Sequence, residues 1–212
     1  MALTHVLFDW DGTLARTLDL WLLGNQRAFE TRGYDFDPET IVREFFHNHD
    51  TVPDRYPHMD FPSIAAEVRS FVMRNLPNVA LYEDAVTVLD ACRARGLTIS
   101  LVSSSARGLL ETGLDAHSLG TRFGSTIAGD DGFGHKPDTR PFRETLRRVG
   151  ATPKETLVIG DSHVDIDAGR AMGCRTCLFA PEPNRLFHDH AASLAKQPDH
   201  VVENWPSVLE LI

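Results

Sequence analysis

The chain has 212 residues, of which 42% are hydrophobic and 24% are charged, and its formal net charge is −9. This length suffices for one core, or for one core with a small accessory domain, and the composition is typical of a globular protein rather than a disordered or membrane-spanning one. The negative charge argues against a nucleic-acid partner, because such binding needs a basic face. Residues 1–8 lack the basic start and long apolar stretch of a secretory signal, so we expect a cytoplasmic protein without a membrane partner.

The three cysteines, Cys92, Cys174 and Cys177, form a sparse and odd set that fits a reducing compartment. The C-x-x-C spacing of the last two leaves a redox pair or half of a zinc site open. The sequence holds no second pair of this spacing, and an apolar run continues from Cys177. We therefore expect both members of the pair to be small core residues.

The chain begins with a predicted strand over residues 4–8, and a segment without strand patterns follows it. From about residue 15 to about residue 81, the sequence predicts helices at 19–32, 38–47 and 62–75, with a loop over 47–60. Asp37 and Pro38 are typical of a helix start, as the cap and the first helical position.

From residue 83 onward, short apolar runs alternate with helical stretches in which apolar residues recur every three to four positions. The apolar runs predict strands at 98–103, 156–160 and 175–179. Strands separated by helices of this length predict an α/β fold, with a doubly wound parallel sheet and helices on both of its faces.

Acids or hydroxyl-bearing residues follow three of these predicted strands. In an open parallel sheet, ligands bind beyond the carboxyl ends of the strands, so we expect these side chains to point into one crevice. Crowded carboxylates repel one another unless a cation is present, which predicts an oxygen-preferring metal such as Mg²⁺. The residues concerned are Asp9, Asp11, Thr13, Ser103, Ser104, Ser105, Asp161 and Asp165.

Each of these acids also has a simpler interpretation. Taken alone, Asp161 is explained about as well by capping of the following helix as by a chemical role. The coincidence of three strand ends favours a site. Lys136 adds a positive charge. A surface lysine is the ordinary interpretation, but Lys136 precedes a proline in a glycine-rich loop, and this placement favours a rigidly presented cation.

These segments together resemble the signature of the haloacid-dehalogenase superfamily. Its parts are Asp-x-Asp-Gly-Thr at 9–13, Ser103, Lys136 before a proline, and Gly-Asp-x-x-x-Asp at 160–165. The run that starts at Gly160 is similar to the phosphoglycolate-phosphatase-like branch. The resemblance implies a Rossmann-like core formed by residues 1–14 and 82–212, and a small helical cap domain formed by residues 15–81.

The resemblance also implies a Mg²⁺-dependent phosphatase that hydrolyses a small phosphorylated metabolite through an aspartyl-phosphate. Asp9 would be the nucleophile, Asp11 the general acid and then the base, and Lys136 the cation between nucleophile and phosphate. The implied catalytic residues are Asp9, Asp11, Ser103 and Lys136, and the implied substrate-binding residues are Thr13, Ser103, Ser104 and Lys136. The implied metal ligands are Asp9, Asp161 and the backbone carbonyl of Asp11, with Asp165 in support of Lys136 or of the waters on the metal.

Some reactions of the superfamily are excluded. Dehalogenases lack the second aspartate of the first motif, which is Asp11 here, and phosphonoacetaldehyde hydrolases need a cap lysine, whereas residues 15–81 contain no lysine. A phosphomutase stays open because it shares the core residues. A non-catalytic binding module on the same fold stays open as well.

The sequence leaves the substrate undetermined. It departs from common family patterns at Arg16 and Thr17 after the first motif, and at Ser104 and Ser105 after the second. One or two cap residues are expected to contact an anionic part of the substrate, out of Arg16, Arg27, Arg43, Arg55, His47, His49 and His58. His163 is expected to face solvent near the metal, and His188 and His190 are expected at the surface.

Overall fold

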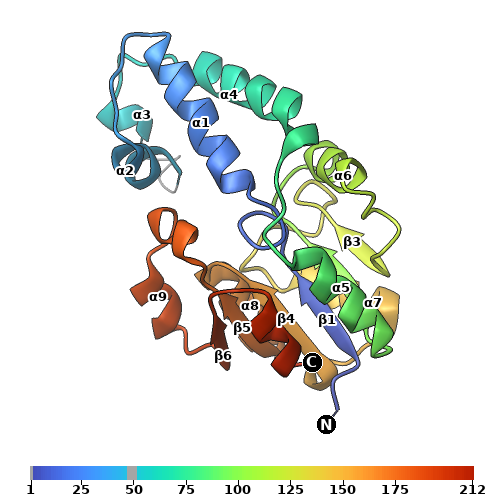
Figure 1. Cartoon of the computed structure of the whole chain (residues 1–212). Helices are drawn as coiled ribbons and strands as arrows, with labels where there is room; N and C mark the ends of the chain where they lie inside the picture. The colour runs from blue at the N-terminus through green and yellow to red at the C-terminus, as the bar shows by residue number, and fades with distance from the viewer. Residues whose placement is uncertain (1, 47–51) are drawn as a thin grey trace.

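The computed structural model describes residues 2–46 and 52–212 (Figure 1). Its strands form one six-stranded parallel sheet in the order β3-β2-β1-β4-β5-β6, so the first strand of the chain lies at the centre. The strands are β1 (His5–Phe8), β2 (Thr98–Val102), β3 (Ser125–Ile127), β4 (Thr156–Gly160), β5 (Arg175–Phe179) and β6 (His200–Val202).

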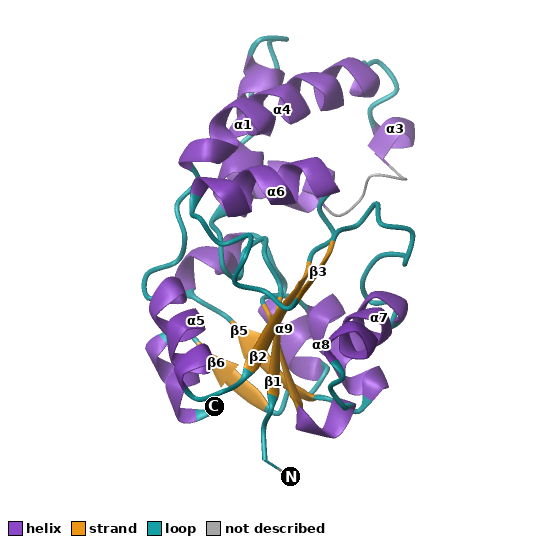
Figure 2. Cartoon of the chain, turned by 90° about the vertical axis from the view of Figure 1, so that its right-hand side faces the viewer, coloured by secondary structure: helices purple, strands orange, loops and turns teal. Residues whose placement is uncertain are grey.

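Helices cover both faces of the sheet, with α5 on one face and α7 and α8 on the other (Figure 2). Alternate residues of β1 divide accordingly: Val6 and Phe8 pack with α5, whereas Leu7 packs with Phe142 of α7 and Ala168 of α8. The α-helices after residue 82 are α5 (Ala85–Ala94), α6 (Arg107–Ala116), α7 (Arg140–Val149), α8 (His163–Met172) and α9 (His190–Ala195).

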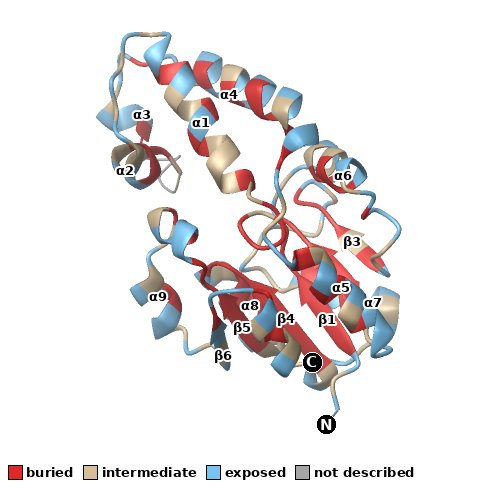
Figure 3. Ribbon diagram, in the orientation of Figure 1, coloured by how far each residue is buried: buried red, intermediate tan, exposed pale blue. Residues whose placement is uncertain are grey.

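A separate group of helices stands beyond the carboxyl ends of the strands (Figure 1). It comprises α1 (Thr17–Glu30), α2 (Pro38–Ile41), a π-helix (Val42–Phe46), α3 (Val52–Arg55) and α4 (Phe61–Asn75). These helices are amphipathic, with buried residues turned inward and exposed residues outward (Figure 3). The inward residues form a hydrophobic cluster around Phe29, Ile41 and Val68, which Phe187 joins from the segment after β5.

The chain enters and leaves this helical segment through two connections that lie side by side. Ala15 pairs with Leu81 in an isolated antiparallel bridge. The Arg16 N–H donates to the carbonyl of Ala80 at 2.9 Å, and the Tyr82 N–H donates to the carbonyl of Leu14 at 3.0 Å. The segment is therefore joined to the sheet layer at one narrow place.

The predicted fold class is confirmed, and so are the four predicted strands, within one residue at their ends. Two strands, β3 and β6, were not predicted, because each is only three residues long. The predicted cap of α2 is confirmed, since the Asp37 carboxylate accepts the Thr40 N–H at 2.7 Å beside Pro38.

The predictions for 38–47 and 47–60 need correction. The helix changes to π geometry at Val42, and residue 47 lies outside the described residues. The loop prediction is wrong at Val52–Arg55, which is helical, and its part over 47–51 lies outside the described residues. No strand occurs in the helical segment as far as residues 16–46 and 52–80 describe it.

The cysteines are core residues, as predicted. All three are free and buried. Burial raises the thiol pKa of Cys92 to about 11 and that of Cys174 and Cys177 to about 12, so the thiols stay protonated. Within residues 2–46 and 52–212, no helix is long and apolar enough to cross a membrane.

His5 gives the fold a pH-dependent element at the amino ends of the central strands. The ring is fully buried, with Nδ1 3.1 Å from Thr156 Oγ1 and Nε2 3.0 Å from Ser100 Oγ. Burial lowers the pKa of His5 from 6.5 to about 4. As pH falls through 6.5, the unfolded chain therefore takes up a proton that the native protein does not accept until about pH 4.

We accordingly expect the His5 contribution to stability to be complete above about pH 6.5 and lost as the pH falls toward 4, by on the order of 3 kcal/mol. Urea unfolding of the wild type and of His5→Gln, measured between about pH 7 and pH 4.5, checks this. The free energy of unfolding should fall less steeply in the variant, because all other groups are common to both proteins. Parallel pH curves would refute the assignment.

Candidate active site

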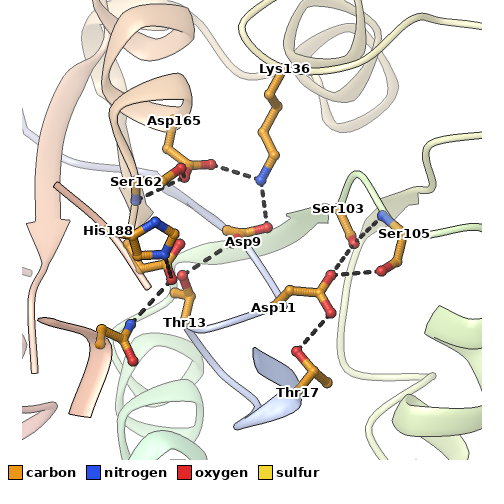
Figure 4. Close-up of polar contacts among 12 residues, drawn as sticks. Asp9, Asp11, Thr13, Thr17, Ser103, Ser105, Lys136, Ser162, Asp165 and His188 are labelled. Carbon is orange, nitrogen blue, oxygen red and sulfur yellow. Dashed lines mark hydrogen bonds and ion pairs between the residues drawn. The ribbon is translucent and has the colours of Figure 1, made fainter. Parts of the chain in front are cut away.

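The carboxyl ends of β1, β2 and β4 bring the predicted site residues together (Figure 4). Asp9 directly follows β1, Ser103 follows β2 and Asp161 follows β4. The Asp9 N–H extends the sheet by donating to the carbonyl of Ile159 at 2.9 Å. All three side chains are buried, so the strands hold them where solvent is largely excluded.

Lys136 lies between two carboxylates. Its Nζ is 2.5 Å from Asp9 Oδ1 and 2.7 Å from Asp165 Oδ1, and the three side chains are at most 6% exposed. Burial lowers the pKa of Lys136, but the two carboxylates raise it more, and the net shift is upward. Burial raises the pKa of Asp9 well above its usual range, and Lys136 offsets part of this shift. The amine therefore stays charged at neutral pH.

Two glycines of the motifs are needed because carboxylates pack against the backbone. Gly12 has a φ of +75°, and a Cβ there would lie 1.9 Å from Asp161 Oδ2. A Cβ on Gly160 would lie 2.2 Å from the carboxyl carbon of Asp165. Any larger residue at either position would displace an acid of the site.

Asp11 lies at the edge of the site and accepts hydrogen bonds from three hydroxyls. Thr17 donates to Oδ1 at 2.7 Å, and Ser103 and Ser105 donate to Oδ2 at 2.9 and 2.8 Å (Figure 4). The Ser103 hydroxyl also accepts the Ser105 N–H at 2.9 Å. These contacts fix Asp11 between the start of α1 and the loop after β2.

The other predicted substrate-binding residues take two different positions. Thr13 is buried, and its hydroxyl donates to Asp9 Oδ2 at 3.2 Å. Ser104 is exposed and lines a cavity beside Asp11. The backbone of Ser104 packs closely on Gly129: a Cβ on Gly129 would lie 2.2 Å from the Ser104 carbonyl oxygen.

Two residues of the site were missed by sequence reasoning. The Asn184 side chain donates to the carbonyl of Gly12 at 2.7 Å and to Asp161 Oδ2 at 3.1 Å. His188 Nε2 lies 2.7 Å from the same Asp161 oxygen, and the prediction that His188 is a surface residue is wrong. Burial lowers the pKa of His188, but the Asp161 carboxylate raises it, and the net shift is upward.

Three buried carboxylates could hold a metal ion. Asp9, Asp161 and Asp165 each offer an oxygen, and these oxygens lie within 4.8 Å of one another. Burial raises the pKa of Asp161 as well as that of Asp9, which indicates that the crowded acids favour a neutralising cation. An all-oxygen ligand set fits Mg²⁺.

The described cap candidates all make contacts within the helical segment. Arg16 pairs with Asp19 at 2.7 Å, Arg43 pairs with Glu44 at 3.0 Å, and Arg55 pairs with Glu44 as well. The guanidinium of Arg27 lies over the Phe71 ring, 5.4 Å from its centre, and the ring of His58 lies 6.1 Å from that of Tyr34. None of these described residues lines the cavity beside Asp11.

The remaining histidine predictions have mixed outcomes. His163, at the start of α8, is exposed, as expected, and His190 has intermediate exposure. His47 and His49 lie outside the described residues.

A parallel sheet whose central strands end in buried carboxylates around a lysine defines a Rossmann-like hydrolase core. The family model of haloacid dehalogenase-like hydrolases matches residues 6–179, and the chain belongs to this family.

Curated relatives match over nearly their whole length. Pyrophosphatase PpaX of Oceanobacillus iheyensis is 24% identical over 219 residues, which cover 100% of this chain and 98% of the relative. Pyrophosphatase PpaX of Bacillus cereus strain AH820 is 28% identical over 223 residues, which cover 100% of this chain and 97% of the relative.

Solved structures share the fold. A Haemophilus somnus protein described as a predicted phosphoglycolate phosphatase has a TM-score of 0.84 and 20% identity, covering 99% of this chain and 97% of its own. A hydrolase of the same family from Deinococcus radiodurans, with bound phosphate and sodium, has a TM-score of 0.82 and 22% identity, covering 97% of this chain and 93% of its own.

Proposed function

We propose that this chain is a Mg²⁺-dependent phosphatase that hydrolyses a phosphomonoester of a small metabolite through an aspartyl-phosphate on Asp9. The observation that carries the proposal is the placement of Asp9, which has Lys136 against one carboxylate oxygen and Asp11 two residues along the same loop. The names of the relatives, which include pyrophosphatases and a phosphoglycolate phosphatase, support a phosphate-cleaving activity. The phosphate bound to the Deinococcus radiodurans relative supports it further.

In the first step, an Asp9 oxygen attacks phosphorus and the bond from phosphorus to the leaving oxygen breaks. Asp11 donates a proton to that oxygen, and Lys136 offsets the negative charge that gathers on the phosphoryl group. In the second step, Asp11 takes a proton from water, which attacks phosphorus and frees Asp9 and inorganic phosphate. Ser103, Ser104 and Thr13 contribute hydroxyl groups that bind or orient the phosphoryl oxygens.

A magnesium ion would be held by Asp9, Asp161 and the Asp11 carbonyl. When bound, it supplies positive charge that screens the approach of the anionic substrate to Asp9. Asp165 supports the site by holding Lys136, and Asn184 and His188 fix the orientation of Asp161.

The helical segment 15–81 acts as a cap domain over the core formed by 1–14 and 82–212. Its hydrophobic cluster, which comes largely from this segment, and its paired connections at Ala15 and Leu81 support this division. The cap moves as a unit over the crevice and excludes water when substrate is bound. The free, buried thiols support a cytoplasmic location.

A phosphomutase is the second candidate function. It uses the same core residues, and a Thermotoga maritima structure named as a candidate β-phosphoglucomutase has a TM-score of 0.83 at 19% identity. A mutase would return the phosphoryl group to a second hydroxyl of the substrate, whereas a phosphatase releases inorganic phosphate. A non-catalytic module has less support, because every acid of the motifs is present, and Asp9, Asp161 and Asp165 lie together.

The proposed activity is tested with p-nitrophenyl phosphate. We expect Mg²⁺-dependent release of p-nitrophenol and inorganic phosphate in equal amounts, abolished by EDTA and restored by added Mg²⁺. Turnover that persists in EDTA would refute the role of the metal. Absence of phosphate release from this compound and from a panel of metabolite phosphates would refute the function.

Asp11→Asn should damage hydrolysis of an alkyl phosphate more than hydrolysis of p-nitrophenyl phosphate. An alkoxide needs a proton in order to leave, whereas p-nitrophenolate is stable enough to leave without it. General acid catalysis is worth about 10²- to 10⁴-fold, so the difference should be large. Single-turnover release of the alcohol is the measurement, because it excludes the second step, in which Asp11 acts as base for both substrates.

Equal losses for the two substrates would show that Asp11 serves structure rather than proton transfer. Ser207→Ala is a matched control. Its hydroxyl contacts Asn204 in the carboxyl-terminal region, away from the site residues, so neither substrate should be affected.

A further inference from the structure

The crevice beside Asp11 contains a cation that the proposed mechanism does not use. A cavity of about 660 Å³ opens there. Asp11, Ser104 and Ser105 lie on its sheet side, and the helices α1, α4 and α6 supply the rest of its lining: Trp21, Arg69, Met73, Ala106, Gly108 and Leu109. Since Asp11 protonates the leaving oxygen in the proposed mechanism, this cavity is where the leaving alcohol lies.

The helical walls of this cavity are apolar except for one cation. Trp21, Met73 and Leu109 present apolar surface, and Arg69 is the one cation among the described lining residues. Trp21 and Arg69 also line a second cavity, within the helical segment. Arg69 and Met73 are four positions apart on α4, so they share one face of that helix. Among the lining residues that the structure describes, Asp11 is the only acid, and three hydroxyls already hydrogen-bond its carboxylate.

Arg69 also differs from the other arginines of the helical segment. Arg16, Arg32, Arg43 and Arg55 pair with carboxylates, Arg27 lies over a phenylalanine ring, and Arg74 donates to a hydroxyl. Across residues 2–46 and 52–212, no ion pair, hydrogen bond or ring contact is present for the Arg69 side chain. Arg69 is an exposed residue, and its guanidinium donors are available to a ligand.

We infer that Arg69 binds a second anionic group on the leaving alcohol. The body of this alcohol is apolar and packs between Trp21, Met73 and Leu109. The inference rests on the proposed phosphatase function and adds the substrate class to it. A guanidinium presents a planar fork of donors that matches a carboxylate or a phosphate, so either group can be the second anion. Because the overall charge is −9, a local cation favours the approach of a doubly anionic substrate to this side of the protein.

The test compares substrates that differ only in the second charge. Para-carboxyphenyl phosphate carries a carboxylate, hydroquinone bisphosphate carries a second phosphate, and para-tolyl phosphate has the same ring with an uncharged methyl group. We expect Arg69→Gln to lower kcat/KM for one or both of the doubly anionic substrates by about 10-fold or more, chiefly through KM. The value for para-tolyl phosphate should stay within about twofold, and Arg69→Lys should recover part of the loss.

Arg74→Gln is the matched control, because it removes an equal charge from the same helix at a residue that does not line the cavity. It should leave every substrate unchanged. Which doubly anionic substrate is affected identifies the second anion as a carboxylate or a phosphate. Equal effects of Arg69→Gln on charged and uncharged substrates, or no effect on any, would overturn the inference.

A binding measurement separates this inference from the proposed function. In an Asp9→Asn background, calorimetry with para-carboxyphenyl phosphate and hydroquinone bisphosphate reports affinity without turnover. A loss of affinity on adding Arg69→Gln supports the role of Arg69 even if the wild type hydrolyses neither compound, and unchanged affinity for both refutes it. The phosphatase proposal is tested separately, by whether the wild type releases inorganic phosphate from any phosphomonoester.

Discussion

Asp9→Asn is expected to reduce phosphate release by at least about 10³-fold, because the amide cannot attack phosphorus or carry the phosphoryl group. The variant should fold. Burial already raises the pKa of Asp9, and Asp165, Asp161 and Asp11 raise it further, so a neutral side chain removes repulsion at this position. The measurement is steady-state phosphate release, together with a thermal melt of each protein.

Asp167→Asn is the matched control for this variant. Asp167 lies on α8 two residues beyond Asp165, but its carboxylate pairs with Lys196 at 2.8 Å instead of facing the site. Its replacement should leave turnover close to that of the wild type. An Asp9→Asn protein that is folded and retains more than a few per cent of activity would rule out Asp9 as the nucleophile.

Lys136→Met is expected to lower kcat by about 10²- to 10³-fold, the usual effect of losing one donor that stabilises transition-state charge. The Lys136 side chain contacts Asp9 Oδ1 and Asp165 Oδ1 and is almost completely buried. Solvent therefore cannot replace its charge when it is removed. Removing it also leaves two buried carboxylates without their cation, at a cost of about 3–5 kcal/mol in folding free energy.

Two further proteins separate chemistry from stability in this experiment. Lys154→Met removes an exposed lysine and should change neither activity nor stability. Lys136→Met combined with Asp165→Asn removes one of the two buried carboxylates that have lost their cation, and should regain stability without regaining activity. Recovery of turnover in the double variant would mean that Lys136 serves the fold rather than the phosphoryl group.

The four inner strands of the sheet and most of the site residues at their carboxyl ends were predictable because the signals are local. β1 and β4 are buried along their whole length and read as continuous apolar runs, and their carboxyl ends carry Asp9 and Asp161. Parallel strands bring such residues together because their carboxyl ends lie at the same edge of the sheet. Lys136 was found from its proline and glycine neighbours rather than from periodicity.

The residues that were missed depend on the path of the chain. Asn184 and His188 come from the segment after β5, where no strand end or motif marks them, and a short 3-10 helix returns this segment to Asp161. Arg69 has an ordinary position on an amphipathic helix, and only the packing of α1, α4 and α6 places it on the wall of a cavity that Asp11 also lines. The sequence shows which face of a helix is polar but not what that face meets.

The division of roles around the site follows from these contacts. Lys136 and Asp165 hold one side of Asp9, and three hydroxyls hold Asp11 on the other side of the same loop. Each acid thus has its own partners, which separates a nucleophile from a proton donor only two residues away.

Transfer of the phosphoryl group to Asp9 is tested most directly by trapping the aspartyl-phosphate during turnover. Acid stops the reaction with Mg²⁺ and substrate present, and borohydride then reduces the acyl phosphate to a homoserine, which peptide mass spectrometry locates. We expect homoserine at position 9 only when substrate and Mg²⁺ are both present, and none in Asp9→Asn. Sustained phosphate release with an unmodified aspartate at position 9, or with the reduced residue elsewhere in the chain, would contradict the mechanism.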